Sequence, residues 1–292
     1  MQSRRGKHVR SEIADLSVRV SSEEPIRARA GGWRLARRAR ILITNLMVLL
    51  AFLVLWEIGA DLYRSPFIPA PSDVWRAAVS LALHGDVNDR TLWAHTAQSL
   101  MRVLAGFAAA VVTGVPLGLL MGLYPGVYRG SRSLVEPLRF IPPLAWIPIA
   151  MVTLTGFTRY AFIIWLGAFF PIFVATLVGV PRIETLHTDV ARVHGASRGW
   201  ILRKVVIPSI LPDILGGMRV GLGVGWMCIV AAEMIGGDMI GLGKLIIKYA
   251  ELMRMAEIVV GMILIGLCGL VMNEILLLVE KRLFRWRWQV QL

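Results

Sequence analysis

The stretch DVARVHGASRGWILRKVVIPSILP, residues 189–212, is a basic and soluble-looking segment between long apolar runs. Helix-forming residues at 189–194 and 200–206 predict two short helices, because Gly195 interrupts the pattern between them. Pro208 and Pro212 are expected to limit the second helix, since proline lacks the backbone N–H that a helix interior needs. The segment is therefore predicted to form a helical hairpin.

This hairpin contains both kinds of side chain that a surface helix needs. Its strongly hydrated charges are Arg192, Arg198, Arg203 and Lys204. Its apolar residues are Ala191, Ala196, Trp200, Ile201, Val205 and Ile207. An amphipathic hairpin of this kind lies at a membrane surface and docks its exposed side into a groove of a partner. The alternative interpretation is an ordinary, positively charged cytoplasmic loop.

The rest of the chain has the composition of a membrane protein. Of the 292 residues, 56% are hydrophobic, and several uncharged runs approach the roughly 20 residues that span a bilayer core. We predict an all-α membrane protein with six transmembrane helices, at residues 41–60, 103–128, 140–154, 160–181, 216–237 and 258–279. The loop 62–96 is expected to carry a short helix at 72–83, and the loop 238–257 a second one within GLGKLIIKYA.

Two of the predicted spans carry glycines at every fourth position. These glycines are Gly114, Gly118 and Gly122 in the second span, and Gly217, Gly221 and Gly225 in the fifth. Each set removes three side chains from one helix face, so another helix can approach closely. The third span contains IPPLAWIP, and prolines at membrane depth are tolerated where neighbouring helices or a cavity satisfy the released carbonyls. We therefore expect the third span inside the bundle.

The formal net charge of +13 first suggests a nucleic-acid partner. The 32 lysines and arginines, however, concentrate in residues 1–40 and in alternate loops, as the positive-inside rule describes. This asymmetry predicts that both termini and the segment 189–212 are cytoplasmic, and it removes most of the case for nucleic acid. Residues 1–40 are expected to form a basic cytoplasmic tail, and residues 41–292 the transmembrane domain.

The sequence contains no pattern typical of a catalytic, cofactor or metal site. Cys228 and Cys268 lie in apolar runs without metal-ligand spacing, and the five histidines lie in tails and loops. The phosphate-binding pattern GxxxxGK[ST] is missing, since the nearest fragment, residues 241–244, is followed by Leu245. We therefore expect a chain that is not an enzyme, and any ATP and Mg²⁺ it depends on would be bound by a partner.

The spacing within residues 189–212 resembles a cytoplasmic motif of ABC importer permeases. That motif reads EAA, three residues, Gly, nine residues, then Ile-x-Leu-Pro. The residues at the corresponding positions are Asp189, Val190 and Ala191, then Gly195, then Val205, Ile207 and Pro208. Asp189 replaces the glutamate of the motif and Val190 its first alanine. The resemblance implies that this segment, with Ala196 and Trp200 on its apolar side, couples the chain to an ATPase subunit.

Further stretches resemble the nitrate, sulfonate, taurine and bicarbonate permease family. They are IPPLAWIP, GMRVGLGVGWMCIVAAEMIG, GLGKLI and the basic, tryptophan-containing end of the chain. The resemblance implies the type I importer permease (MetI-like) fold in an inner membrane. It also implies a homodimer surrounded by membrane lipid, two ATP-binding cassette ATPase subunits and an extracytoplasmic solute-binding protein. The implied cargo is a small anion, with taurine or another aliphatic sulfonate first and nitrate or bicarbonate next.

Residues of the translocation path are harder to assign from sequence. Glu233 is a candidate because ionisable residues in membrane spans are commonly functional, although it can equally be a structural partner for an arginine or for backbone amides. Trp226, Met227, Thr153 and Thr155 are further candidates that could also serve packing. Three alternative functions stay open: an ion-coupled secondary transporter, a membrane anchor or receptor, and a permease for a non-anionic metabolite such as a thiamine precursor.

Overall fold

The computed structural model describes residues 24–63, 65, 67–183 and 185–284. Over these residues the chain forms helices and turns and contains no strand, so the predicted all-α fold is confirmed. The chain divides into two compact units, residues 1–65 and residues 66–292, which we describe separately.

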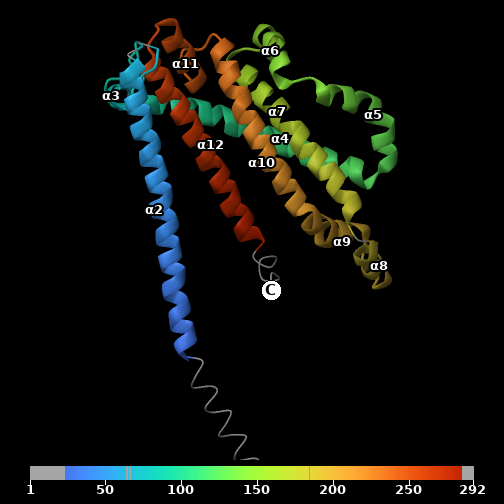
Figure 1. Ribbon diagram of the computed structural model, residues 1–292. Helices are drawn as coiled ribbons and strands as arrows, with labels where there is room; N and C mark the ends of the chain where they lie inside the picture. The colour runs from blue at the N-terminus through green and yellow to red at the C-terminus, as the bar shows by residue number, and fades with distance from the viewer. Residues whose placement is uncertain (1–23, 64, 66, 184, 285–292) are drawn as a thin grey trace, which may run out of the picture. The chain divides into compact units, whose positions relative to one another are not determined.

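The helix of the first unit is α2, Glu24–Tyr63 (Figure 1). Its part Arg40–Tyr63 is 24 residues long and apolar enough to cross a membrane, in agreement with the span predicted at 41–60. The predicted boundary between tail and membrane domain, at residue 40, falls inside this helix. Residues 1–23 of the predicted tail lie outside the described residues.

Three long helices form the centre of the second unit, with α7 packed along both of the others. They are α4, Leu92–Leu123, α7, Gly156–Gly179, and α10, Ile207–Ile235. Figure 1 shows α7 and α10 running side by side. The helix α4 begins eleven residues before the predicted span at 103, because the polar residues of its first turns are paired inside the unit, as described below.

The two predicted glycine ladders both face α7. A Cβ atom added at Gly118 of α4 would lie 2.8 Å from the Phe173 carbonyl oxygen and 2.7 Å from the Thr176 Cβ. On the other side, a Cβ atom at Gly221 of α10 would lie 2.8 Å from the Ala168 carbonyl oxygen. The expected close helix approach is confirmed, and it gives α7 a backbone contact on each flank.

The third predicted span, at residues 140–154, is wrong as a single helix. The chain instead forms α5, Pro125–Phe140, the short 3₁₀ turn η1, Pro143–Trp146, and α6, Ile147–Thr153. The path bends by 87° between α5 and the η1–α6 pair. Pro142 and Pro143 explain the break, because neither can donate the backbone N–H that would continue α5. The segment 129–139, expected as a loop between the second and third spans, is therefore helical, and the second span ends at Leu123 instead of residue 128.

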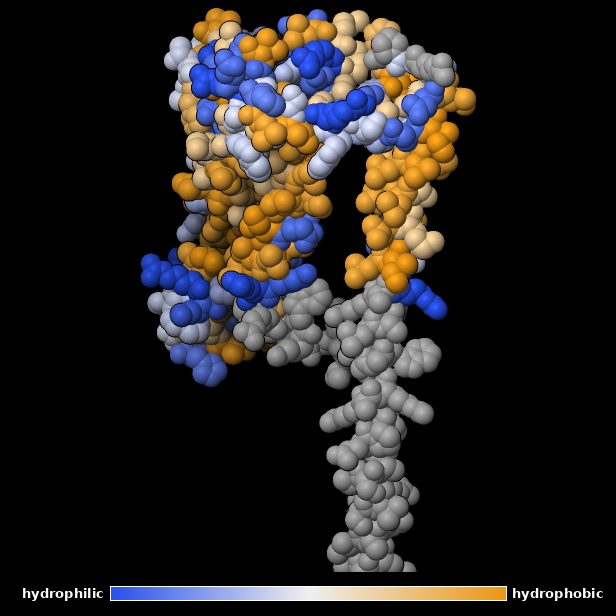
Figure 2. All heavy atoms as spheres, turned by 90° about the vertical axis from the view of Figure 1, so that its left-hand side faces the viewer, coloured by the Kyte–Doolittle hydropathy of each residue, from blue (hydrophilic) through white to orange (hydrophobic). Residues whose placement is uncertain are grey.

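The remaining helices of the second unit frame this centre. The predicted short helices are confirmed as α3, Pro71–Leu83, and α11, Leu242–Glu251. The last span is α12, Met255–Leu283. Counting α2, five helices are long and apolar enough to cross a membrane, or up to six if the bent α5–α6 pair counts as one span. Figure 2 shows an apolar belt between two hydrophilic ends of the second unit.

Candidate functional site

The predicted hairpin forms at one end of the second unit, which we call the coupling end (Figure 1). Its first helix is α8, Thr185–Val193, which begins four residues before Asp189. The N–H of Gly195 donates to the Arg192 carbonyl at 2.9 Å, and the N–H of Ala196 donates to the Ala191 carbonyl at 3.0 Å. This pair of bonds is a Schellman cap, and Gly195 adopts the left-handed φ of +81° that the cap requires. The cap accounts for the spacing Ala191, Gly195, Ala196.

The second half of the hairpin differs from the prediction. After Ser197, whose hydroxyl accepts the Trp200 N–H at 3.3 Å, the chain forms α9, Arg198–Ile201, and the π-helical turn η3, Leu202–Val206. These continue directly into α10, so Pro208 and Pro212 do not end the second helix. Pro208 lies in the first turn of α10, where a missing N–H is tolerated, and the wider π turn before it relieves the clash of its ring. The hairpin is thereby fused to a membrane span.

The hairpin leaves apolar side chains exposed. On α8, Leu186, Val190 and Val193 are 65%, 49% and 85% exposed, and their spacing places them on one face. Trp200 is 51% exposed on the second arm. Leu186 and Val193 were absent from the predicted site, although the i, i+4, i+7 pattern in the sequence could have identified them. This exposed stripe is a surface that a partner can cover.

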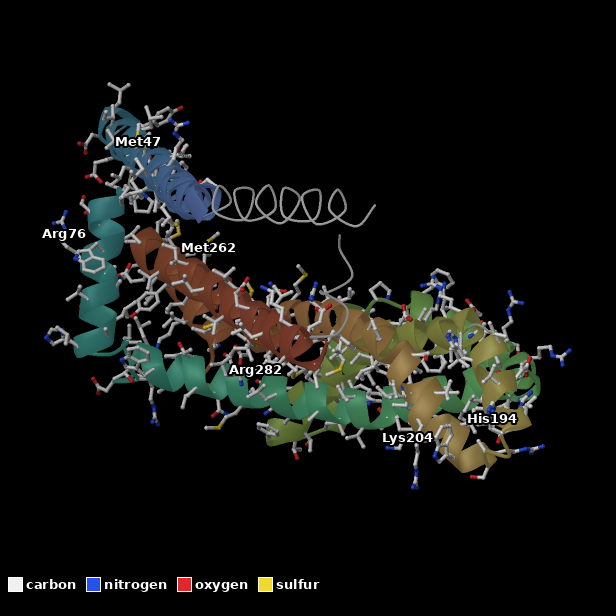
Figure 3. The ribbon with its side chains drawn as sticks, turned by 90° about the horizontal axis from the view of Figure 1, so that it is seen from below. Met47, Arg76, His194, Lys204, Met262 and Arg282 are labelled. Carbon is white, nitrogen blue, oxygen red and sulfur yellow. The ribbon has the colours of Figure 1, made fainter. Side chains whose placement is uncertain are left out.

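A groove of about 1030 Å³ separates α8 from η3 and the start of α10. Nine residues of the segment 189–212 line it, namely Val190, Ala191, His194, Trp200, Lys204, Val205, Pro208, Ser209 and Pro212. Figure 3 shows His194 and Lys204 on this hairpin, at the end of the unit away from Arg76 of α3. The predicted residues Asp189 and Gly195 are exposed beside the groove, and Asp189 pairs with Arg192 at 3.2 Å. The structure thus gathers most of the predicted coupling residues into one exposed hairpin.

Glu233 lies at the opposite end of α10, in a buried polar network. Its carboxylate accepts the Arg102 Nη1–H at 2.8 Å and the Ser99 hydroxyl at 2.9 Å. The side chains of Glu233 and Arg102 are 1% and 2% exposed. Arg102 also donates from Nη2 to Asp238 at 2.5 Å, which in turn accepts from Arg159 at 3.1 Å. These contacts match the structural alternative that the sequence left open for Glu233.

The same carboxylate holds the start of α11, which explains the glycines of GLGK. The Gly243 N–H donates to Glu233 at 3.0 Å, and the Leu242 N–H donates to Ser99 at 2.9 Å. Gly241 has a φ of +149°, and a Cβ atom there would lie 2.5 Å from a Glu233 oxygen. Side chains of α4 and α10 thus satisfy the free amides of α11, and glycine leaves the space for them.

A second polar cluster ties the loop after α3 to the same end. The Asp86 carboxylate accepts the Lys248 ammonium at 2.9 Å and lies 3.5 Å from Nε2 of His95. His95 contacts the backbone of Gly241 through Nδ1. Burial works to raise the pKa of Asp86, but Lys248 and the N–H groups of Arg90 and Asn88 outweigh it and lower that pKa. Asp86 therefore stays ionised.

The other predicted path residues have separate surroundings. Trp226 is buried and donates from Nε1 to the Ile265 carbonyl of α12 at 3.1 Å, whereas Met227 is 73% exposed. Thr153 is exposed and donates to the Ile149 carbonyl at 2.8 Å, and Thr155 is an exposed residue before α7. The assignment of these four residues to a translocation path stays a prediction. Among the described residues, no group of three metal-ligating side chains occurs.

These features define a class of protein. Membrane-length helices pack through glycine faces. One of them, α10, is continuous with an exposed amphipathic hairpin to which a partner can bind. These are the features expected of a multi-pass membrane protein that works with a partner docked on an amphipathic segment.

The comparisons with known proteins identify the family. The chain belongs to the binding-protein-dependent transport system inner membrane components, because the model of that family matches residues 114–286. It is 39% identical to a putative ABC transporter permease protein of Methanocaldococcus jannaschii, over 80% of this chain and 88% of that one. It is 34% identical to the taurine transport system permease protein TauC of Escherichia coli, over 94% of this chain and all of that one.

More distant matches agree on family and fold. The chain is 32% identical to the nitrate import permease protein NrtB of Synechocystis, over 78% of this chain and 84% of that one. An inward-facing structure of the MetNI methionine ABC transporter has a TM-score of 0.52 at 22% identity, over 63% of this chain and 94% of that chain. This neighbour shows that the predicted MetI-like fold is correct.

Family membership settles the general function. The chain is the membrane-spanning permease subunit of an ABC importer, a multi-pass inner membrane protein, and a separate subunit hydrolyses ATP. The family implies an ATPase and a solute-binding protein as partners. An ion-coupled secondary transporter and a membrane anchor without transport are both outside this family, so neither alternative is retained.

Proposed function

We propose that the chain imports a small anion, with taurine or a related aliphatic sulfonate as the first candidate and nitrate or bicarbonate next. The observation that carries this proposal is the match to the taurine permease protein, which extends over 94% of this chain and the whole of that relative. Relatives named for nitrate import and bicarbonate transport match at 32% and 31% identity. The named cargoes share a compact anionic group.

The proposed assembly is a homodimer of this chain, embedded in lipid, with two ATPase subunits that bind ATP and Mg²⁺. In it, the exposed stripe of Leu186, Val190 and Val193 lies in a cleft of the ATPase. In this assembly the coupling end is cytoplasmic, and both termini of the chain are cytoplasmic as well. ATP-driven closure of the two ATPases moves the paired hairpins, and because the hairpin continues into α10, this motion reaches the membrane spans. The cargo arrives from the solute-binding protein on the far side.

Two measurements test the assembly and the cargo. The permease, purified with its partners from native membrane, is expected to carry an ATPase subunit in equal amount. Reconstituted in vesicles with its binding protein, the complex is expected to take up taurine when ATP is supplied to the ATPase side. Nitrate and bicarbonate are the next substrates to assay. ATP-dependent uptake of a thiamine precursor, with none of the three anions transported, would contradict the proposed cargo class.

A further inference from the structure

No residue of the helix α5 is buried in the second unit. It contains four charged residues, Arg129, Arg132, Glu136 and Arg139. At 100° per residue these four fall within one side of the helix, whereas Val127, Leu134 and Leu138 fall on the opposite side. The side that carries the charges has a net charge of +2 at neutral pH. This combination of charge and exposure needs an explanation in a membrane protein.

The two ends of α5 lie at different depths. Its start follows Gly122, where an added Cβ atom would lie 2.8 Å from Val180, next to the coupling hairpin. Its end leads into Ile147 and Ala150, which pack in one core cluster with Tyr160 and Ala232, near the ends of α7 and α10 away from the hairpin. The helix therefore runs from the coupling end into the other half of the unit (Figure 1).

The arginines of α5 are distributed along the length of the helix. Arg132 and Arg139 lie seven and fourteen residues after Pro125, about 10 Å and about 21 Å along the helix axis. A cytoplasmic position explains Arg129, but the positive-inside rule does not explain Arg139, about 15 Å further along the helix. Glu136 accepts the Tyr128 hydroxyl at 2.8 Å and lies 3.5 Å from Arg139. In the described part of the chain, Arg132 has neither an ion pair nor a hydrogen bond from its side chain.

Lipid is a poor neighbour for this side of α5. A charged side chain at the centre of a membrane span is disfavoured by about 2.5–3.5 kcal/mol even on the more permissive scales. Direct packing against a second copy of the chain is also unfavourable for this side of α5, since a two-fold axis would bring two equal positive faces together. Water and anions between the two faces remove both difficulties. Broken spans of this kind are tolerated where they line a water-filled cavity.

We infer that the charged side of α5 lines the translocation path, and that Arg132 and Arg139 are the groups that bind the anionic cargo along it. The inference rests on the proposed function, since it takes a small oxyanion or sulfonate as the ligand. The two guanidinium groups, nearly two helical turns apart, offer successive sites, and Glu136 beside Arg139 weakens one of them so that the anion can leave. Arginine suits this role because its fork of N–H donors fits sulfonate, nitrate and carboxylate oxygens.

The first test is transport by the whole complex in vesicles. Replacing both arginines, Arg132→Gln with Arg139→Gln, is expected to lower anion uptake per ATP hydrolysed at least tenfold. Replacing both with lysine is expected to keep uptake within about threefold, because the positive charge remains. The matched control is Arg76→Gln on α3, an exposed arginine paired with Asp73 outside α5. Wild-type uptake by the double glutamine variant would overturn the inference.

A second test does not depend on the identity of the cargo. Single cysteines replace Arg132, Arg139 or Leu134 in a background with Cys228→Ser and Cys268→Ser. A small, water-soluble methanethiosulfonate cation is expected to modify positions 132 and 139 at least tenfold faster than position 134, and taurine or nitrate is expected to slow it. Equal rates at 132 and 134 would rule out a water-filled path along this side. If the wild-type complex transports none of the three anions, the proposed cargo fails, while the cysteine pattern still decides the role of α5.

Discussion

Glu233 shows how one side chain can connect several helices. Its carboxylate accepts hydrogen bonds from the Arg102 guanidinium of α4, from the Ser99 hydroxyl and from the Gly243 N–H of α11. A buried ion pair contributes little net stability compared with apolar residues of similar size, but removal of one partner leaves an uncompensated charge. The pair therefore sets which helices meet at this end more than it adds to stability.

The first prediction concerns this ion pair. Arg102→Met is expected to destabilise the protein by about 3–5 kcal/mol, because Glu233 stays buried without its partner. Arg102→Met combined with Glu233→Leu is expected to recover part of that loss. Thermal unfolding in detergent measures both, with Arg76→Met as the control at an exposed pair. A double variant less stable than Arg102→Met would contradict this account of the network.

Gly195 carries the second prediction. No atom lies within 4 Å of the position that a Cβ would take, so a side chain fits sterically, but the φ of +81° costs a residue other than glycine or asparagine about 1–2 kcal/mol. Gly195→Glu is expected to insert normally and to lose ATP-driven uptake, because a bulky charge disturbs the docked hairpin. Gly195→Asn is the control, since asparagine tolerates this conformation. Normal ATPase association and uptake in Gly195→Glu would count against the coupling role.

At the scale of helices, the glycine faces of α4 and α10 hold both against α7. Backbone contacts of this closeness depend on the absence of a side chain, and apolar lipid provides no alternative driving force for packing. The coupling hairpin joins this layer because η3 runs into α10 without a break. The hairpin is therefore continuous with a packed layer of helices.

A single methyl group tests this packing. Gly118→Ala is expected to destabilise the protein by about 1–3 kcal/mol, because the new Cβ would lie 2.7 Å from that of Thr176. Gly223→Ala on α10, where no atom lies within 4 Å, is expected to be neutral or slightly stabilising. The two midpoints of thermal unfolding are compared directly. Equal effects would show that the α4–α7 contact tolerates a wider separation.

The loop between α3 and α4 is joined to α11 by Asp86, and this junction is sensitive to acid. The folded-state pKa of Asp86 is lowered, so its ionised form stabilises the fold above the unfolded pKa of about 3.9, and that stability is lost as the pH falls through the folded pKa. Asp86→Asn is expected to lower the unfolding temperature at pH 5–7 and to differ less from the wild type below about pH 4. Lys248→Gln, which leaves His95 as the nearest basic group, should shift the acid-induced loss to higher pH. If the difference in unfolding temperature between Asp86→Asn and the wild type does not change with pH, the ionised carboxylate is not what stabilises the junction.

The second unit has two polar ends that differ in their surfaces. The coupling end presents an exposed apolar stripe and a groove, whereas the other end buries its charges in the Glu233 and Asp86 clusters. A permease that docks an ATPase on one side and receives a binding protein on the other needs this asymmetry. In the proposed orientation, the loop after α3 faces away from the cytoplasm.

Labelling of intact cells tests that orientation. A cysteine at Asn88, in the loop after α3, is expected to react with a membrane-impermeant maleimide in intact cells. A cysteine at Lys281, at the end of α12, is expected to react only after the membrane is permeabilised. Both are placed in a background without Cys228 and Cys268. The reverse labelling pattern would show that the chain has the opposite orientation in the membrane, and the hairpin would then not be cytoplasmic.

Local patterns in the sequence determined much of this protein. The glycine spacing predicted the faces that pack, and the short helix at 72–83 was predicted within one residue of its start. Gly195 predicted the turn of the hairpin, and the Schellman cap found there depends only on residues that are close in sequence. Helix periodicity and caps are local properties, so they can be read before the chain is folded.

The tertiary structure alone decided the rest. Arg102 and Glu233 are 131 residues apart, and His95 and Gly241 are 146 apart, so no local pattern indicated that they meet. The helix α5 was also not predicted from the sequence. Its charged residues lower its hydropathy below that of an ordinary span, and the prolines after it were assigned to a separate span at 140–154. Only the packing of the residues on either side of α5, with Gly122 against Val180 and with Ile147 and Ala150 in the core cluster of Tyr160, shows where its two ends lie. Contacts between distant residues depend on how the helices pack, and this is why they required the folded molecule.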